Sequence, residues 1–138
     1  MEGTLVDSSV ILDILADDPR WYPWSEEQLA RAKWKGYLYL NPIIWTEISI
    51  GFQRIEELEE VLGKLDMHLI AIPREALFLA GKAFVKYKMR RRTKNVPLPD
   101  FFVGAHAAIE SLPLLTRDPG RVRTYFPAVK LITVESAR

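Results

Sequence analysis

The chain has 138 residues, of which 49% are hydrophobic, so it can form one compact domain with a real core and is not a disordered protein. It contains no cysteine, which excludes disulfides and thiolate metal sites, and its formal net charge of +1 does not by itself predict a nucleic-acid partner. The longest uncharged stretch, residues 36–46, is far shorter than the ~20 residues of a membrane-spanning helix, and the N-terminus has no pattern of a secretion signal. We therefore expect one soluble, cytoplasmic domain over residues 1–138, without a membrane partner.

The first half of the chain alternates strand and helix patterns. Apolar runs predict strands at residues 3–7 and 37–40, and the helix patterns cover residues 8–17, 25–36, 42–52 and 54–66. Residues 18–24 contain two prolines and two tryptophans and are expected to form a loop, although nothing in the sequence explains its aromatic content. Ser25 is expected to cap the helix that follows this loop.

The second half continues the same alternation. Strands are expected at residues 68–72, 113–116 and 130–134, and helices at residues 73–92 and 100–110, with a loop and short helix over 117–126. Strands separated by helices predict an α/β fold whose parallel sheet is covered on both faces.

Four carboxylates fall on four separate segments of this expected fold. Asp7 ends the first strand, Asp118 follows the fourth strand, Asp100 begins a helix, and Glu47 lies on the helix after the second strand. Because an open parallel sheet forms its ligand crevice at the carboxyl ends of its strands, these acids can converge. Asp100 alone would be read as a helix cap, and Gly104, one turn later, is expected to leave open space beside it.

Crowded carboxylates repel one another, and a hard divalent cation removes that cost. Mg²⁺ and Mn²⁺ prefer oxygen ligands, whereas the two histidines, His68 and His106, lack zinc-ligand spacing and are interpreted as structural. The pattern therefore predicts metal-assisted hydrolysis of phosphodiester bonds.

The motifs LVDSSVILDIL, NPIIWTEISIG, LPDFFVGAHA and LLTRDPGRVRTYFP resemble, in this order and spacing, those of PIN-domain ribonucleases, in particular VapC-type toxins of prokaryotic toxin–antitoxin pairs. The resemblance covers essentially the whole chain. It implies a five-stranded parallel sheet in the order 3-2-1-4-5, and RNA as substrate. It also implies a protein antitoxin, a homodimer, and a Mg²⁺ or Mn²⁺ site made by Asp7, Glu47, Asp100 and Asp118. Ser9 and Thr116 match positions that help to hold the acids, and Ser8 is the next candidate.

Basic residues cluster just before Asp100. Six bases at the end of the long helix exceed what its dipole needs, so the segment is expected to guide RNA toward the acids, and a solvated helix end is the rival interpretation. The residues expected to bind nucleic acid are Arg90, Arg91, Arg92, Lys94 and Arg117. Asp13 lies on the first helix and is expected to face solvent.

Three other functions compete with a ribonuclease. A phosphoryl-acceptor signalling domain or a haloacid-dehalogenase-type phosphatase also uses a parallel sheet with an acidic pocket, but each needs a second acid beside Asp7, where this chain has Ser8 and Ser9. A PIN-like module that binds RNA or a partner without cutting remains open, because metal binding does not guarantee turnover.

Overall fold

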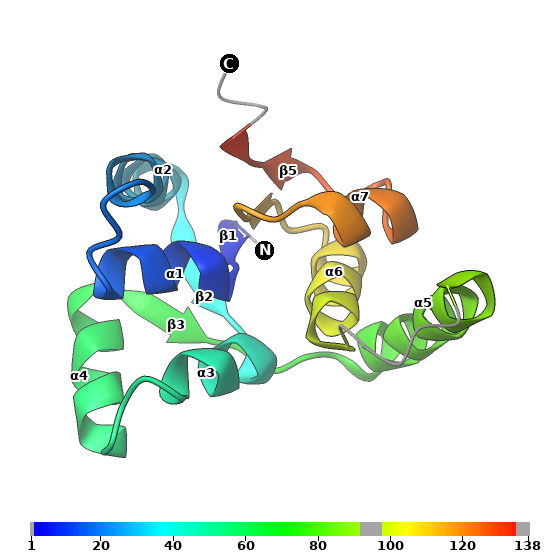
Figure 1. The fold of residues 1–138 in the computed structure, drawn as a ribbon, viewed down its shortest axis with the longest axis horizontal. Helices are drawn as coiled ribbons and strands as arrows, with labels where there is room; N and C mark the ends of the chain where they lie inside the picture. Colours follow the sequence, from blue (N-terminus) through cyan, green and yellow to red (C-terminus); the bar gives the residue numbers. More distant parts are fainter. Residues whose placement is uncertain (1, 92–97, 135–138) are drawn as a thin grey trace.

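The structure is a computed structural model that describes residues 2–91 and 98–134. Its centre is a parallel sheet of five strands in the order β3-β2-β1-β4-β5, as the resemblance implied (Figure 1). Helices flank this sheet, so the predicted α/β class is confirmed. None of the described helices is long and apolar enough to cross a membrane.

The first half of the chain follows the predicted order of elements. The elements are β1 (Gly3–Val6), α1 (Ser8–Leu15), α2 (Tyr22–Lys35), β2 (Tyr37–Leu40), α3 (Pro42–Ser49) and α4 (Ile55–Lys64). Asn41 caps α3, because its Oδ1 accepts a hydrogen bond from the Ile44 amide at 2.9 Å, and Pro42 occupies the first turn, where no amide donor is needed.

The second half supplies the remaining strands, which are shorter than expected. The elements are β3 (Met67–Leu69), α5 (Arg74–Arg91), α6 (Leu98–Glu110), β4 (Leu114–Leu115), α7 (Gly120–Tyr125) and β5 (Leu131–Ile132). The two-residue strands β4 and β5 still pair in register with their neighbours, and apolar residues of β4 are fully buried in the core.

The strand order places the helices on two sides of the sheet. The chain moves from β1 to β3 in one direction and then returns past β1 to β4 and β5. Because such crossovers are right-handed, the helices after β3 and β4 cover the face opposite to those after β1 and β2. Figure 1 shows α1, α2 and α4 on one side and α5, α6 and α7 on the other, with α5 reaching away from the sheet.

Two local expectations are wrong. Helix α2 begins at Tyr22 and not after residue 24, because Pro23 is tolerated in a first helical turn; Ser25 is therefore inside the helix, fully buried, and is no cap. The space beside Gly104 is not open. A Cβ atom there would lie 2.5 Å from the Phe126 ring, so glycine is needed for α6 to pack against this ring.

Candidate active site

The acids gather where the strand order reverses. Strands β1 and β4 are neighbours, with Val6 paired to Leu115, and the Asp7 amide donates to the Leu115 carbonyl at 2.9 Å. Asp7 and Thr116, the next residue on each strand, therefore leave the sheet side by side at its carboxyl edge. This is the edge at which open parallel sheets bind their ligands.

Asp7 is held by two hydroxyl groups. Its Oδ2 accepts hydrogen bonds from Thr116 Oγ1 at 2.8 Å and from Ser9 Oγ at 3.0 Å. Asp7 occupies the N-cap position of α1, yet its side chain makes no capping bond to the helix amides. The carboxylate is thus oriented toward the crevice by neutral donors and is not consumed by helix capping.

The same hydroxyls tie the loop after β4 to the start of α1. The Asp118 amide donates to Thr116 Oγ1 at 3.0 Å, and the Arg117 amide donates to Ser9 Oγ at 3.2 Å. Each hydroxyl therefore accepts from the loop and donates to Asp7, which fixes the loop that carries Asp118 relative to the first acid.

Glu47 and Asp100 arrive from the two helical layers. Glu47 lies on α3 and accepts a hydrogen bond from Ser8 Oγ at 3.0 Å. Asp100 lies in the first turn of α6 and forms an ion pair with Arg121 of α7, with 2.9 Å between Nη1 and Oδ2. The sequence interpretation missed Arg121, although its place three residues after Asp118 in the same motif was a usable signal.

The two helices that carry these acids are joined by a buried polar contact. Asn41 Nδ2 and His106 Nδ1 lie 3.1 Å apart, and both side chains are fully buried. The pKa of His106 is lowered because burial disfavours its charged form. This contact fixes the start of α3 against α6 and supports the interpretation of His106 as structural.

The electrostatics show that the acids are close enough to repel one another. Burial raises the pKa of Asp7, and Asp100 raises it further, while the hydroxyls of Thr116 and Ser9 lower it. Burial also raises the pKa of Glu47, with added repulsion from Asp7 and Asp100. The pKa of Asp100 is raised by burial, lowered by Arg121 and raised again by Asp118. All four predicted acids therefore share one electrostatic neighbourhood.

The donor set fits a hard divalent cation in its chemistry. Every ligand atom offered is a carboxylate oxygen, and three of the four acids carry raised pKa values that a nearby positive charge would lower. Over residues 2–91 and 98–134, however, no three Asp, Glu or His side chains are drawn together tightly enough to hold a metal ion. The carboxylates thus lie in one neighbourhood, but they are not close enough in this structure to coordinate one metal ion together.

Of the residues predicted to bind nucleic acid, the structure describes the side chains of Arg90, on α5, and Arg117, in the loop after β4. Arg90 lines a groove of about 520 Å³ between α5 and α7, together with Lys86 and Tyr125. The side chain of Arg91 and all of Arg92 and Lys94 lie outside the described residues.

Arg117 and Asp13 form a pair that the sequence interpretation missed. Asp13 was expected to face solvent, but it is 3% exposed and accepts from Arg117 Nε at 2.9 Å and Arg117 Nη2 at 3.0 Å. The expectation was wrong because helix periodicity locates a side chain on its own helix but cannot identify a partner 104 residues away.

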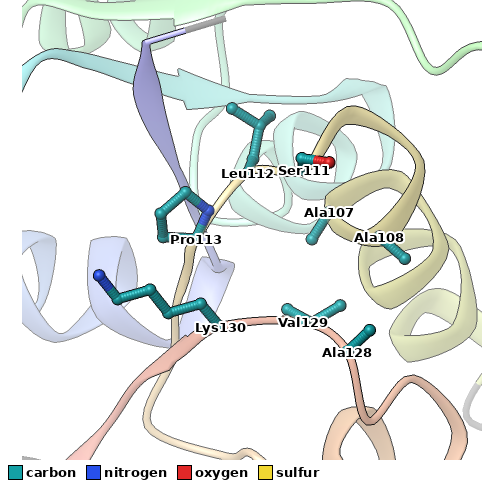
Figure 2. A pocket seen from close by; sticks show the side chains of 8 residues that line it. All are labelled: Ala107, Ala108, Ser111, Leu112, Pro113, Ala128, Val129 and Lys130. Atoms are coloured by element: carbon teal, nitrogen blue, oxygen red, sulfur yellow. The ribbon is translucent and has the colours of Figure 1, made fainter.

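A separate pocket lies at the other end of the sheet. It has a volume of about 220 Å³ and lies between the second half of α6 and the segments that lead into β4 and β5 (Figure 2). Its lining includes Ala107, Pro113 and Lys130, and Pro113 and Lys130 come just before their strands. Because the acids follow the carboxyl ends of the strands, this pocket is not part of their crevice.

Comparison with known proteins agrees with the fold. A chain of VapBC-1 from nontypeable Haemophilus influenzae superposes with a TM-score of 0.68 at 13% identity, covering 94% of this chain and 96% of that chain. A chain of DNA-bound VapBC from Salmonella typhimurium gives 0.67 at 15% identity, covering 96% and 98%. A chain of Rickettsia felis VapBC2, bound to a promoter DNA fragment, gives 0.66 at 16% identity, covering 94% and 97%.

At these identities the likeness concerns the fold alone. A search of curated proteins found no match to the sequence. A family model described as the PIN domain matches residues 4–127, which span β1 to the end of α7 and include all four acids. The chain therefore belongs to the PIN domain family.

Proposed function

We propose that this protein is a Mg²⁺- or Mn²⁺-dependent ribonuclease that acts in the cytoplasm as the toxin of a type II toxin–antitoxin pair. PIN domains are nucleases, so a nuclease activity follows from the family. The metal, the RNA substrate and the antitoxin are the finer parts of the proposal, and each has its own support.

The observation that carries the proposal is the convergence of four acids at the strand-order reversal, where burial and neighbouring carboxylates raise the pKa values of Asp7, Glu47 and Asp100. Among the described residues, the cation paired with this group is Arg121 on Asp100. A protein gains no stability from carboxylates that repel one another, and perturbed acids in a cleft are typical of a functional site.

Asp7, Glu47, Asp100 and Asp118 would hold the cation. A bound Mg²⁺ or Mn²⁺ would offset the charge on a phosphate and favour water as a nucleophile at neutral pH. Thr116 and Ser9 hold Asp7 through its Oδ2, and Ser8 holds Glu47 through its Oε1. These hydroxyls act as neutral donors that orient the acids without cancelling their charge.

RNA is supported by the groove between α5 and α7, which has basic side chains in its lining. Lys86 and Arg90 supply positive charge, and Tyr125 supplies a ring on which a base can stack. Helix α7 contributes to the lining of this groove and also carries Arg121, which pairs with Asp100. The basic residues Arg91, Arg92 and Lys94 follow Arg90 in the sequence and are proposed to bind RNA with it, whereas Arg117 has a different role that is argued below.

The proposal of a protein antitoxin is supported by the solved structures with a similar fold, which are structures of VapBC. We propose a cognate antitoxin that covers the acid crevice, and a homodimer as the state of the free toxin. Co-purification with the product of a neighbouring reading frame and light scattering of the isolated protein test these two parts.

The central experiment measures cleavage of several RNAs with Mg²⁺, with Mn²⁺ and with EDTA. We expect cleavage only with a divalent cation, and a loss of at least about a hundredfold for Asp7→Asn. Asp17→Asn is the matched control, because Asp17 is exposed on the same segment and its φ of 50° suits asparagine. The control is expected to cleave at the wild-type rate.

Three outcomes would contradict the proposal. Cleavage that persists in Asp7→Asn would place the chemistry elsewhere, and cleavage in EDTA would exclude the cation. RNA binding without scission in every metal would favour the alternative, a PIN-like module that binds without cutting.

A further inference from the structure

The Asp13–Arg117 pair is the most completely buried charge pair among the described residues. Asp13 is 3% exposed and the Arg117 side chain 26%, and the guanidinium meets both carboxylate oxygens, at 2.9 and 3.0 Å. Ser25 Oγ adds a third donor to Asp13 at 2.8 Å. A two-point contact of this kind fixes the orientation of the guanidinium as well as its position.

The aromatic loop that the family resemblance left unexplained completes this cluster. The Arg117 guanidinium lies 5.1 Å from the centre of the Trp21 ring, within cation–π range. Trp21 is held in place because Asp18 Oδ1 accepts the amides of Arg20 and Trp21, each at 2.9 Å. The loop before α2 therefore places the Trp21 ring against the Arg117 guanidinium that bonds to Asp13.

The backbone of Arg117 belongs to the candidate active site. Arg117 stands between Thr116, which donates to Asp7, and Asp118, the fourth acid. Its amide donates to Ser9 Oγ, the second hydroxyl on Asp7. The side chain is thus anchored on Asp13 of α1 and on Trp21 just before α2, while the main chain bonds to Ser9 and lies between Thr116 and Asp118.

This geometry argues against a contact between Arg117 and a phosphate of the substrate. The Nε–Nη2 edge of the guanidinium already bonds to Asp13, and one face of the guanidinium lies over Trp21, so a phosphate would find only the remaining Nη hydrogens. Breaking a buried pair leaves an uncompensated charge, which costs far more than an exposed phosphate contact returns.

We propose that Arg117 is a positioning residue, clamped by Asp13 and Trp21 so that Thr116 and Asp118 face Asp7, and that it does not contact the RNA. The inference rests on the proposed function for its catalytic consequence. Its structural consequence, the fixed loop of residues 116–118, can be measured without RNA.

The first test is amide hydrogen exchange by NMR in the metal-free protein. Asp13→Asn and Arg117→Lys are expected to speed exchange of the Arg117 and Asp118 amides by at least about tenfold, while the β2 amides stay protected. Arg31→Gln is the control, because it removes an exposed ion pair with Glu27 from α2 and is expected to change neither set. Wild-type exchange at both loop amides in a folded Asp13→Asn protein would overturn the inference.

The second test separates positioning from phosphate binding by kinetics. Arg117→Lys keeps the charge but loses the fork, so we expect kcat to fall by about tenfold or more with KM little changed. Asp13→Asn is expected to give the same pattern, although Asp13 cannot bind a phosphate. The slope of log affinity for RNA against log salt should be unchanged in both variants.

A phosphate contact would give the opposite result. Arg117→Gln would then raise KM and reduce the salt slope by about 0.7, and Arg117→Lys would retain most activity. If the wild-type protein cleaves no RNA, the proposed function fails, and the exchange experiment still decides whether the clamp positions the loop. If Asp13→Asn does not fold, Arg117→Lys carries both tests, because its side chain is partly exposed.

Discussion

Asp7, the N-cap of α1, and Asp13, inside α1, have opposite electrostatic surroundings. Asp13 is buried with a guanidinium and a hydroxyl, so its charge is fully compensated. Asp7, at the start of the same helix, has hydroxyl donors and other acids as neighbours, and its pKa is raised by burial and by Asp100. The difference indicates that Asp13 serves the structure, whereas Asp7 has only neutral donors and other acids beside it and no cationic partner among the described residues.

The two regions are also physically linked. The loop that pairs with Asp13 through Arg117 is also the loop in which Thr116 donates to Asp7 and the Asp118 amide donates to Thr116. The Asp13–Arg117 pair thus stabilises the loop against the repulsion among the acids around Asp7. Functional sites commonly cost stability that the surrounding structure offsets.

The largest effect on the free energy of unfolding is expected when the ion pair between Asp13 and Arg117 is broken. Asp13→Asn should lower the free energy of unfolding by about 2–3 kcal/mol, less than for a fully buried pair because Arg117 is partly exposed. Urea unfolding measures this. Glu27→Gln, which removes an exposed partner of Arg31, should change stability by less than about 0.5 kcal/mol. Equal effects of the two substitutions would contradict the comparison.

A substitution among the acids around Asp7 is expected to increase the free energy of unfolding. Without divalent cations, Asp7→Asn should raise the free energy of unfolding by about 1 kcal/mol, or the midpoint by about 2–4 °C, because it removes a charge that burial and the nearby Asp100 both disfavour. Thermal unfolding in EDTA measures this, with Asp17→Asn as the control. A loss of stability would mean that the hydroxyl bonds to Asp7 outweigh the repulsion.

Arg121 allows a sharper version of the same test. Its ion pair with Asp100 is exposed, at 45% and 42% for the two side chains, so it is weak and competes with a cation for the carboxylate. Arg121→Gln should therefore tighten Mn²⁺ binding by about threefold, as measured by calorimetry. Lys64→Gln, which removes an exposed pair with Glu60, is the control and should change nothing. Weaker Mn²⁺ binding in Arg121→Gln would contradict the competition.

The smallest expected effect is in pH dependence. Asp7, Glu47 and Asp100 have raised pKa values, so the folded state binds more protons than the unfolded state just above the ordinary carboxyl pKa of about 4. Their unfavourable contribution is present at neutral pH and is relieved as pH falls through the raised values.

The measurement compares two proteins so that other titrations cancel. The stability advantage of Asp7→Asn over the wild type, from urea unfolding in EDTA, should shrink between pH 7 and pH 5 as the wild-type acids take up protons. An advantage that grows on acidification would mean that the pKa of Asp7 is lowered in the folded protein.

Much of the fold could be read from local patterns. Apolar runs located all five strands, and caps and periodicity located the helices to within a few residues, except where Pro23 lies inside the first turn of α2. The positions of Asp7 and Asp118 after adjacent strands follow from the same patterns together with the strand order that the family resemblance implied.

The partners of the charged side chains could not be read in this way. Asp13 was expected to face solvent because nothing in the sequence near it indicates Arg117 as a partner. Gly104 was expected to leave open space because Phe126, which fills that space, lies 22 residues later. Arg121 was overlooked on Asp100, which lies 21 residues earlier, although its place in the same motif as Asp118 was a usable signal.

The sequence by itself determined the α/β alternation and the places of four acids along the chain, because periodicity and strand ends are properties of neighbouring residues. The tertiary structure alone decided which charges are compensated, since this depends on residues from distant segments meeting in a low-dielectric interior. Asp7 and Asp13 are the same residue type on one helix, and the loop that arrives from β4 makes one a buried ion pair and leaves the other among repelling acids.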